Sequence, residues 1–354
     1  MIPKRRAFQL TAFLTLALLT ACEPLAPHQT PSVIVVTGVT QDAPSRIDEV
    51  LLGAGGQRAP AQAATPVGGA VSTPIPTVTP TSTPSATPTA TPFLCSEPTG
   101  TVISASFDSA IVGGEVPYLM YQPPCFYETW RRYPYVILMH GTGYDEQMWV
   151  DLGVVEALDK GIRTGTLPPM VLIMPDGGLL AESNVAPVAQ SWEAVILDEL
   201  IPALESFETG YCLWGTREGR AIGGISRGGF WAFSIAMRHP GRFAALGGHS
   251  PHFDPDHVGA DVNPLSLASG TALLKSGLRI WMDNAAMDPV APMVEQMAQT
   301  LQARGVEHEY VIHPTGAHEM SYWMAHVPEY LAFYGRDWPL DVMVLPSCED
   351  PSPS

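Results

Sequence analysis

The segment that most constrains the fold of this chain is residues 221–237, with the sequence AIGGISRGGFWAFSIAM. The apolar run 221–225 predicts a buried strand, and residues 229–238 have the pattern of a helix. Between them Ser226 stands among glycines in the pattern Gly-x-Ser-x-Gly. A sharp turn from strand to helix exposes a serine hydroxyl for attack, so Ser226 is the candidate nucleophile. The alternative is a glycine-rich connection without chemistry.

Short apolar runs alternate with helical patterns through residues 93–354, which suffice for one sizeable domain. Two opening strands followed by strand and helix in alternation predict an α/β fold, with a mostly parallel central sheet flanked by helices on both faces. We expect strands at 102–107, 116–121, 135–140, 171–174, 221–225, 243–247, 278–282 and 309–312, and helices at 192–207, 229–238, 290–304 and 320–334.

Candidates for the acid and the base follow two of the expected strands, at the sheet edge where parallel strands end and chemistry gathers. Asp288 lies after strand 278–282, and His318 lies after strand 309–312. His318 would accept the proton of the serine, and Asp288 would fix the imidazole tautomer. Asp283 is the alternative acid, and His313 is the alternative base.

Backbone amides are the expected donors to the oxyanion of such a reaction. One is the amide of Arg227, directly after the nucleophile. The other belongs to the loop after strand 135–140, where we favour Thr142 over Gly141.

Several motifs of this region together resemble the putative esterase (esterase D) family, which includes feruloyl esterases, S-formylglutathione hydrolases and mycolyltransferases. The match covers roughly residues 116–334 and rests on YPYVILMHG at 133–141, VLIMPDGG at 171–178, DELIP at 198–202, GISRGG at 224–229 and HPGRF at 239–243. The resemblance implies an α/β-hydrolase fold, no cofactor, and carboxylic ester hydrolysis through an acyl-enzyme. It also supports Asp288 and His318. Arg227 stands where the family often has methionine, and its side chain would alter the pocket or attract an acidic substrate.

The N-terminus has the features of an export signal. Lys4, Arg5 and Arg6 precede an apolar run at 7–19, and Leu-Thr-Ala-Cys follows at 19–22. This pattern predicts a signal peptide over 1–21 and resembles a bacterial lipobox, with lipid on Cys22 and anchoring to the outside of the cell membrane. The alternative is an ordinary signal peptide with an incidental cysteine.

Residues 22–92 are expected to form a disordered tether. Its part 60–92 contains 8 Pro and 9 Thr, so it cannot bury enough apolar surface to fold and is expected to form a solvated stalk. The run at 33–36 has strand-forming residues but no obvious partner, and it is assigned to the tether.

Charge and cysteine content agree with export. The chain has 18 basic and 35 acidic residues, and removal of the three basic residues of the signal leaves 15 against 35, a net charge of −20. Such a surface repels nucleic acid and anionic lipid, so membrane attachment would come from the lipid alone. Four further cysteines predict two disulfides, for which we favour Cys95 with Cys125 and Cys212 with Cys348 among three possible pairings.

Two further groups of side chains leave alternatives open. A loop with His249, His252 and His257 could hold a metal together with nearby aspartates, but solvated polar residues are the favoured interpretation, and no metal is expected. Five aromatic residues could line a cleft or belong to the core: Tyr144, Trp149, Trp192, Trp231 and Trp323.

The predicted function is that of a serine ester hydrolase acting on polysaccharide-linked or small carboxylic esters outside the cytoplasm. The alternatives are an acyltransferase of the mycolyltransferase kind and a non-catalytic, surface-tethered binding lipoprotein.

Overall fold

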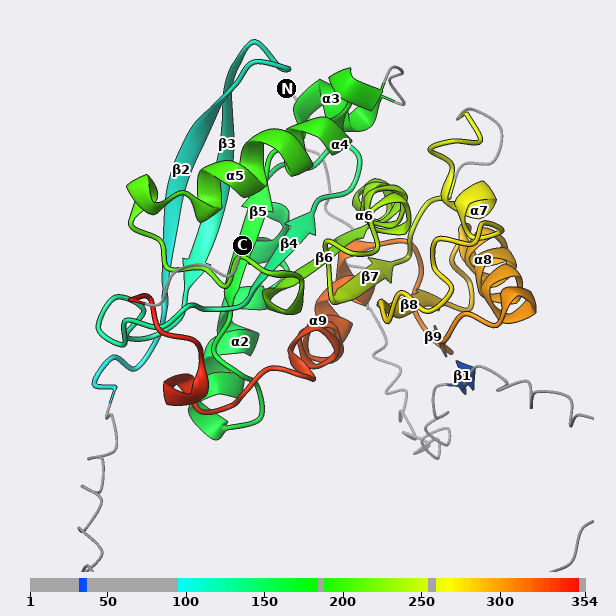
Figure 1. The fold of residues 1–354 in the computed structure, drawn as a ribbon. Helices are drawn as coiled ribbons and strands as arrows, with labels where there is room; N and C mark the ends of the chain where they lie inside the picture. The colour runs from blue at the N-terminus through cyan, green and yellow to red at the C-terminus, as the bar shows by residue number, and fades with distance from the viewer. Residues whose placement is uncertain (1–31, 37–94, 184–187, 254–258, 350–354) are drawn as a thin grey trace, which may run out of the picture.

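The computed structural model describes residues 32–36, 95–183, 188–253 and 259–349 (Figure 1). The expected signal peptide, Cys22 and the Pro/Thr-rich stretch lie outside these residues. Among the helices described, none has the length and apolar character needed to cross a bilayer.

The centre of the molecule is a nine-stranded sheet in the order β1-β9-β8-β7-β6-β4-β5-β3-β2. The six strands from β9 to β5 are parallel to one another, and β1, β3 and β2 are added antiparallel at the two sides. The expected mostly parallel α/β fold is therefore confirmed. The strands are β1 Ser32–Val36, β2 Thr101–Ser109, β3 Gly114–Gln122, β4 Tyr135–Met139, β5 Val171–Pro175, β6 Arg220–Ile225, β7 Ala245–His249, β8 Arg279–Ala285 and β9 His308–His313.

Helices follow most of the parallel strands. The expected helix 192–207 consists of α4, a π-helical segment at Val195–Leu200, and α5. Helix α2 was not predicted from the sequence. The helices are α1 Met148–Asp151, α2 Val154–Thr164, α3 Gly178–Glu182, α4 Trp192–Ala194, α5 Ile201–Glu205, α6 Arg227–Arg238, α7 Pro264–Leu267, α8 Ala291–Arg304 and α9 Met320–Gly335, with 3₁₀ turns at Val188–Gln190, Phe207–Thr209, Arg217–Gly219 and Val342–Val344.

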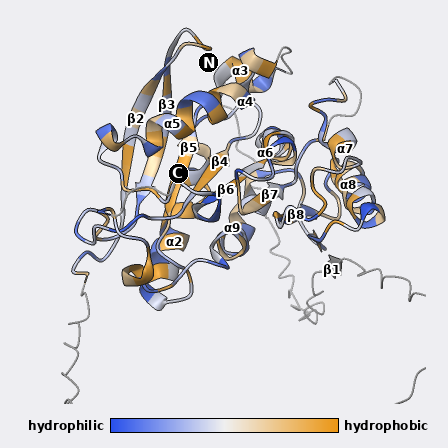
Figure 2. Cartoon of the chain, in the orientation of Figure 1, coloured by the Kyte–Doolittle hydropathy of each residue, from blue (hydrophilic) through white to orange (hydrophobic). Residues whose placement is uncertain are grey.

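Two apolar layers cover the two faces of the sheet. Helices α4, α5, α6 and α8 pack on one face around Trp192, Phe230 and Val294. Helices α2 and α9 cover the other face around Leu158 and Tyr330. Strands β4 and β5 are apolar along their whole length, and every residue of β4, β5, β6 and β7 is buried, as strands covered on both faces require (Figure 2).

Residues 32–36 correct the sequence interpretation, which left this run in the tether. They form β1, which pairs antiparallel with β9 from Ser32 opposite Ile312 to Val36 opposite His308. The Val and Ile residues of this run favour extended backbone, and β9 offers it the open edge of the sheet. The partner lies about 280 residues further along the chain, so no local pattern could indicate it.

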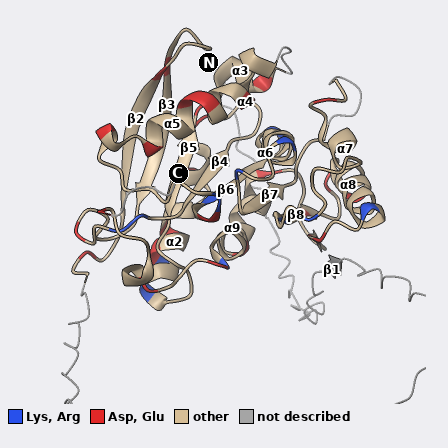
Figure 3. Ribbon diagram, in the orientation of Figure 1, with Lys and Arg blue, Asp and Glu red and all other residues tan. Residues whose placement is uncertain are grey.

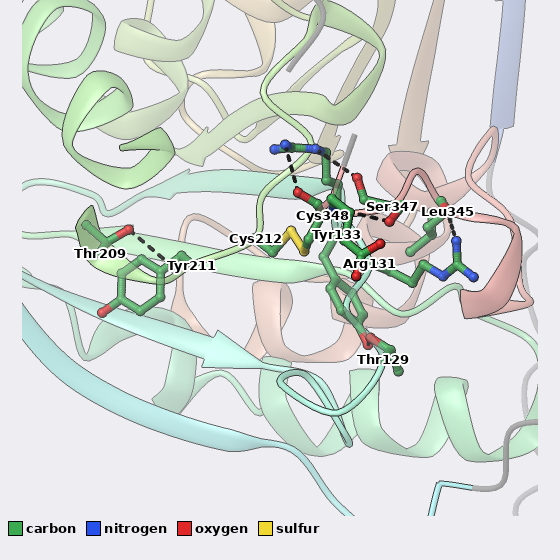
Figure 4. The surroundings of a disulfide bond; sticks show 11 residues. Thr129, Arg131, Tyr133, Thr209, Tyr211, Cys212, Leu345, Ser347 and Cys348 are labelled. Carbon is green, nitrogen blue, oxygen red and sulfur yellow. Dashed lines mark hydrogen bonds between the residues drawn. A yellow bond between two sulfur atoms is a disulfide. The ribbon is translucent and has the colours of Figure 1, made fainter. Parts of the chain in front are cut away.

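Both favoured disulfide pairings are present, Cys95 with Cys125 and Cys212 with Cys348. The second joins the C-terminal segment to the body of the domain (Figure 4). On either side of it the Cys348 amide donates to the Trp130 carbonyl at 3.0 Å, and the Tyr133 amide donates to the Cys212 carbonyl at 2.9 Å. The last described residues are thereby fixed across three separate chain segments.

A half-buried ion pair connects α5 to the sheet. Arg220 of β6 donates two hydrogen bonds of 2.6 Å to the two carboxylate oxygens of Glu205, and the hydroxyl of Tyr135 in β4 donates to the same carboxylate at 2.5 Å. Burial disfavours the charged guanidinium, but the hydrogen bonds and charge of Glu205 outweigh it and raise the pKa of Arg220. The guanidinium of Arg220 therefore keeps its charge beside Glu205.

We expect Glu205→Gln to lower the free energy of unfolding by about 2–3 kcal/mol, because it leaves a largely buried guanidinium without its counter-charge. Urea denaturation followed by circular dichroism measures the change. Glu309→Gln is the control, because it breaks the more exposed pair with Arg336 and should cost less than about 1 kcal/mol. Equal losses in the two variants would contradict the role assigned to Glu205.

Candidate active site

Ser226 occupies a strained turn between β6 and α6, with φ 53° and ψ −112°. A non-glycine residue in this region costs on the order of 1–3 kcal/mol and persists only where its surroundings enforce it. Here the Ser226 amide donates to the His249 carbonyl at 3.0 Å, and the Ser226 carbonyl accepts from the His252 amide at 3.0 Å. The end of β7 and the loop after it therefore hold both polar groups of the Ser226 backbone.

The glycines on either side of Ser226 allow this turn to be tight. A Cβ at position 224 would lie 2.3 Å from the carbonyl carbon of Gly228, and one at position 228 would lie 2.2 Å from the carbonyl oxygen of Met139. Strand β6, the first turn of α6 and the end of β4 thus meet at backbone contact. Any side chain at either position would displace the serine.

A continuous line of hydrogen bonds runs from Ser226 through His318 to Asp288. The Nε2 atom of His318 lies 2.9 Å from the Ser226 Oγ atom, and Nδ1 lies 3.0 Å from Oδ1 of Asp288. A carboxylate only accepts, so Nδ1 carries the imidazole proton and Nε2 is left to accept from the serine hydroxyl. The loops after β6, β8 and β9 supply these residues, as the sequence order predicted.

Asp288 has the burial and charge state that suit a partner of the imidazole. Its side chain is fully buried, whereas that of His318 is 26% exposed. Burial opposes ionisation of Asp288, but hydrogen bonds, foremost that from His318 and including the Val290 amide at 2.9 Å, outweigh it and lower its pKa below the usual value of 3.8. The carboxylate is therefore ionised at neutral pH and faces an imidazole that solvent can reach.

The two alternative residues lie elsewhere. Asp283 is fully buried, accepts from Nδ1 of His249 at 2.8 Å, and also accepts from the hydroxyls of Tyr322 and Tyr330 at 2.6 and 3.0 Å. His313 is buried beside Glu329, at 3.3 Å. Neither residue is bonded to Ser226 or His318 in the described structure.

The loop that carries Thr142 lies beside the serine. A Cβ at Gly141 would stand 3.5 Å from the Ser226 Cβ, and the Gly143 amide donates to Glu182 at 2.9 Å. Thr142 lies between these two fixed points, and Arg227, the other predicted oxyanion donor, is the first residue of α6. The N-terminus of that helix adds its partial positive charge to this place.

His140, the last residue of the strand expected over 135–140, supports this loop. The Gly177 amide donates to Nε2 of His140 at 2.9 Å, so Nδ1 carries the proton and donates to the Gly141 carbonyl at 2.9 Å. The buried imidazole thereby joins the loop after β5 to the loop beside Ser226. Its position at the end of a predicted strand was the only signal in the sequence.

The Arg227 side chain turns away from solvent and joins α6 to α3. Its guanidinium donates to the carbonyls of Ala181 and Glu182 at 3.0 and 3.3 Å and lies 4.7 Å from the ring centre of Phe230. The cation is thus engaged with backbone carbonyls and an aromatic face. This arrangement accounts for an arginine directly after the nucleophile without a charged substrate.

The other predicted groups divide between core and surface. Four of the five aromatic residues, Trp149, Trp192, Trp231 and Trp323, are buried core, and Tyr144 is 44% exposed. His249 is a buried residue of β7 held by Asp283 and Tyr334, so it is not a ligand of a loop metal site. His257 and its aspartate neighbours lie outside the described residues.

Comparisons with known proteins agree with this architecture. An esterase of Mycobacterium tuberculosis is 32% identical over 152 residues, which are 41% of this chain and 31% of that protein. An endo-1,4-beta-xylanase/feruloyl esterase of Xylanibacter ruminicola is 32% identical over 123 residues, or 33% of this chain and 16% of that protein. The chain thus matches less than a third of the length of these curated relatives.

Solved structures show the fold. A ferulic acid esterase superposes with a TM-score of 0.60 at 21% identity, covering 67% of this chain and 99% of that one. An S-formylglutathione hydrolase of Staphylococcus aureus gives a TM-score of 0.57 at 17% identity, covering 66% and 98%. Both are α/β-hydrolases. The family model described as Putative esterase matches residues 109–334, well over half of the chain, and the protein therefore belongs to this esterase family.

Proposed function

We propose that the protein is a serine carboxylic-ester hydrolase that works through an acyl-enzyme. The observation that carries the proposal is the bonded line from Ser226 through His318 to Asp288, with 2.9 Å at the first step and 3.0 Å at the second. Membership of the esterase family supports it. The strain at Ser226 supports it further, because strained backbone clusters at functional sites.

The geometry specifies the proton path. Oγ of Ser226 attacks the ester carbonyl carbon while its proton passes to Nε2 of His318, and Asp288 stabilises the imidazolium through Nδ1. The amides of Arg227 and Thr142 donate to the oxyanion. Collapse of the tetrahedral intermediate expels the alcohol with the proton from His318. Water then attacks the acyl-enzyme by the same route and releases the acid.

The proposed substrates are esters of the feruloyl or acetyl type on polysaccharide, or small carboxylic esters. The names of the relatives and neighbours support this class. A hollow of about 570 Å³ lies next to Gly177, whose amide is bonded to His140, but Ser226 and His318 are not among its lining residues. It is lined by Ile111, Val112, Glu115, Val116, Pro117, Asp176, Gly177, Gly178, Leu179, Leu180 and Ser183.

The proposed location is outside the cytoplasm, with the chain anchored to the bacterial membrane by lipid on Cys22. The disulfides support an oxidising compartment. Acidic residues are spread over helices and loops on both faces of the sheet (Figure 3), which disfavours attachment through a basic surface.

We expect Ser226→Ala to lower kcat for p-nitrophenyl acetate and methyl ferulate by at least about 10⁴-fold, because it removes the attacking oxygen. Ser234→Ala is the matched control, since it removes a hydroxyl on the same helix that donates to the Val262 carbonyl. It should keep activity within about twofold. A folded wild-type protein that cleaves neither ester nor transfers acyl groups would favour a binding lipoprotein.

Asp288→Asn should lower kcat by about 10³–10⁴-fold while the protein stays folded, because the amide no longer stabilises the imidazolium. Steady-state kinetics and thermal unfolding measured together separate this loss from instability. Asp283→Asn should act mainly on stability, since its carboxylate closes a buried network. Activity of the Asp288 variant within tenfold of wild type would contradict the assignment of the acid.

Cys22→Ser should move the protein from the membrane fraction to the soluble exported fraction of a bacterial host, because no thiol remains to carry lipid. Fractionation followed by immunoblotting measures this, with Cys95→Ser as the control that keeps the lipidation site. An unchanged membrane fraction for the Cys22 variant would overturn the anchor.

A further inference from the structure

A cluster of three side chains with metal-binding groups lies behind the loop that carries His318. It consists of His313 at the end of β9 and of His326 and Glu329 in α9. Their candidate ligand atoms all lie within 4.8 Å of one another, and this group is the only one of its kind found among the described residues. The catalytic proposal makes no use of it.

The contacts within the cluster point its polar atoms toward one another. Nε2 of His313 lies 3.3 Å from Oε2 of Glu329, and Nδ1 of His326 lies 3.3 Å from Oε1 of the same carboxylate. The two imidazoles stack at 3.6 Å between ring centres. The Glu329 carboxylate thus contacts a ring nitrogen of each histidine.

Nε2 of His313 is a buried polar atom whose contact with Glu329 lacks the geometry of a hydrogen bond. The side chain of His313 is 4% exposed, and its Nε2 atom makes no hydrogen bond of proper geometry in the described structure. A buried nitrogen with a poorly directed contact is less well satisfied than one with a full hydrogen bond. This Nε2 atom is directed at the space shared with Glu329, where an ion would satisfy it.

We propose that His313, His326 and Glu329 bind a divalent transition-metal ion, with Zn²⁺ as the expected occupant. Two imidazoles and one carboxylate are a donor set that suits Zn²⁺ and disfavours Ca²⁺ and Mg²⁺, which prefer oxygen ligands. Tetrahedral coordination at about 2.0–2.1 Å draws ligand atoms to about 3.3 Å from one another. The partly exposed His326 and the exposed Glu329 supply this movement and leave a coordination position open to water.

Such an ion would act on stability and on the geometry of the site. His313 and His326 stand at the two ends of residues 314–325, which include His318. Within this segment Gly316 packs closely on Tyr322, since a Cβ at position 316 would lie 2.7 Å from the Tyr322 side chain. Coordination would therefore join the two ends of the segment that carries His318. The ion itself takes no part in the proposed ester chemistry, and the inference stands whether or not the protein is an esterase.

The test is the titration of ZnCl₂ into the full chain, stripped with chelator and free of any histidine tag, by calorimetry and thermal unfolding. One ion per chain should bind, and at a hundredfold excess over Kd the melting temperature should rise by about 5 °C. His326→Ala and Glu329→Gln should each weaken binding at least about tenfold. Glu329→Gln keeps the size of the side chain, so the test does not depend on the alanine variant alone.

His239→Ala serves as the control, because it removes a partly exposed histidine that also faces a carboxylate, at 2.8 Å from Glu193. It should bind Zn²⁺ as the wild type does. The absence of binding by the wild-type protein would overturn the proposal. Undiminished binding in both cluster variants would place the ion elsewhere and overturn it equally.

Discussion

The backbone strain at Ser226 is the constraint on which the rest of the site depends. A serine at φ 53° would adopt a more favourable backbone conformation unless its neighbours prevented it. Here neighbouring segments of the chain hold it in place. Gly224 and Gly228 allow β6, α6 and β4 to meet at backbone contact. The loop after β7 then fixes the amide and the carbonyl of Ser226. Without these contacts the hydroxyl would not face His318.

The strands behind the serine are held by a buried polar network that the sequence did not indicate. Asp283 accepts from His249, Tyr322 and Tyr330, and His249 accepts in turn from the Tyr334 hydroxyl at 2.9 Å. Burial, with the charge of Asp283, raises the pKa of Tyr330 well above 10, so its hydroxyl keeps its proton and donates. The network connects β7, β8 and α9, which carry or adjoin the loops of the site. It is fully satisfied, as a buried polar network must be to stabilise a fold.

The sequence predicted the parts of the site that depend on local order along the chain. Ser226, Asp288 and His318 each follow a parallel strand, and strand ends of one sheet necessarily gather at one edge. Asp288 was favoured over Asp283 because Asp283 stands at the end of the strand expected over 278–282, whereas a carboxylate in the loop reaches His318 more easily. The strand runs on to Ala285, and this buries Asp283 within the sheet and leaves Asp288 in the loop.

Other features depend on contacts between distant segments, and no pattern along the chain encodes these. His140 accepts a hydrogen bond from the amide of Gly177, which is 37 residues away. Arg227 donates hydrogen bonds to carbonyls of α3, about 45 residues away. Neither partner is recognisable from composition. The contacts of His313 with His326 and Glu329 of α9 were likewise not predictable from the sequence. The pairing of β1 with β9 is the largest such contact, and it was missed for the same reason.

That pairing changes the mechanics of the proposed anchor. Because residues 32–36 are part of the sheet, residues 37–94 connect two points of the same domain. They therefore add nothing to the distance between the lipid anchor and the domain. With lipid on Cys22, only the ten residues up to Ser32 separate the membrane from the domain, a span of at most about 35 Å. The proposed anchor would therefore hold the sheet close to the bilayer rather than far out in the cell envelope.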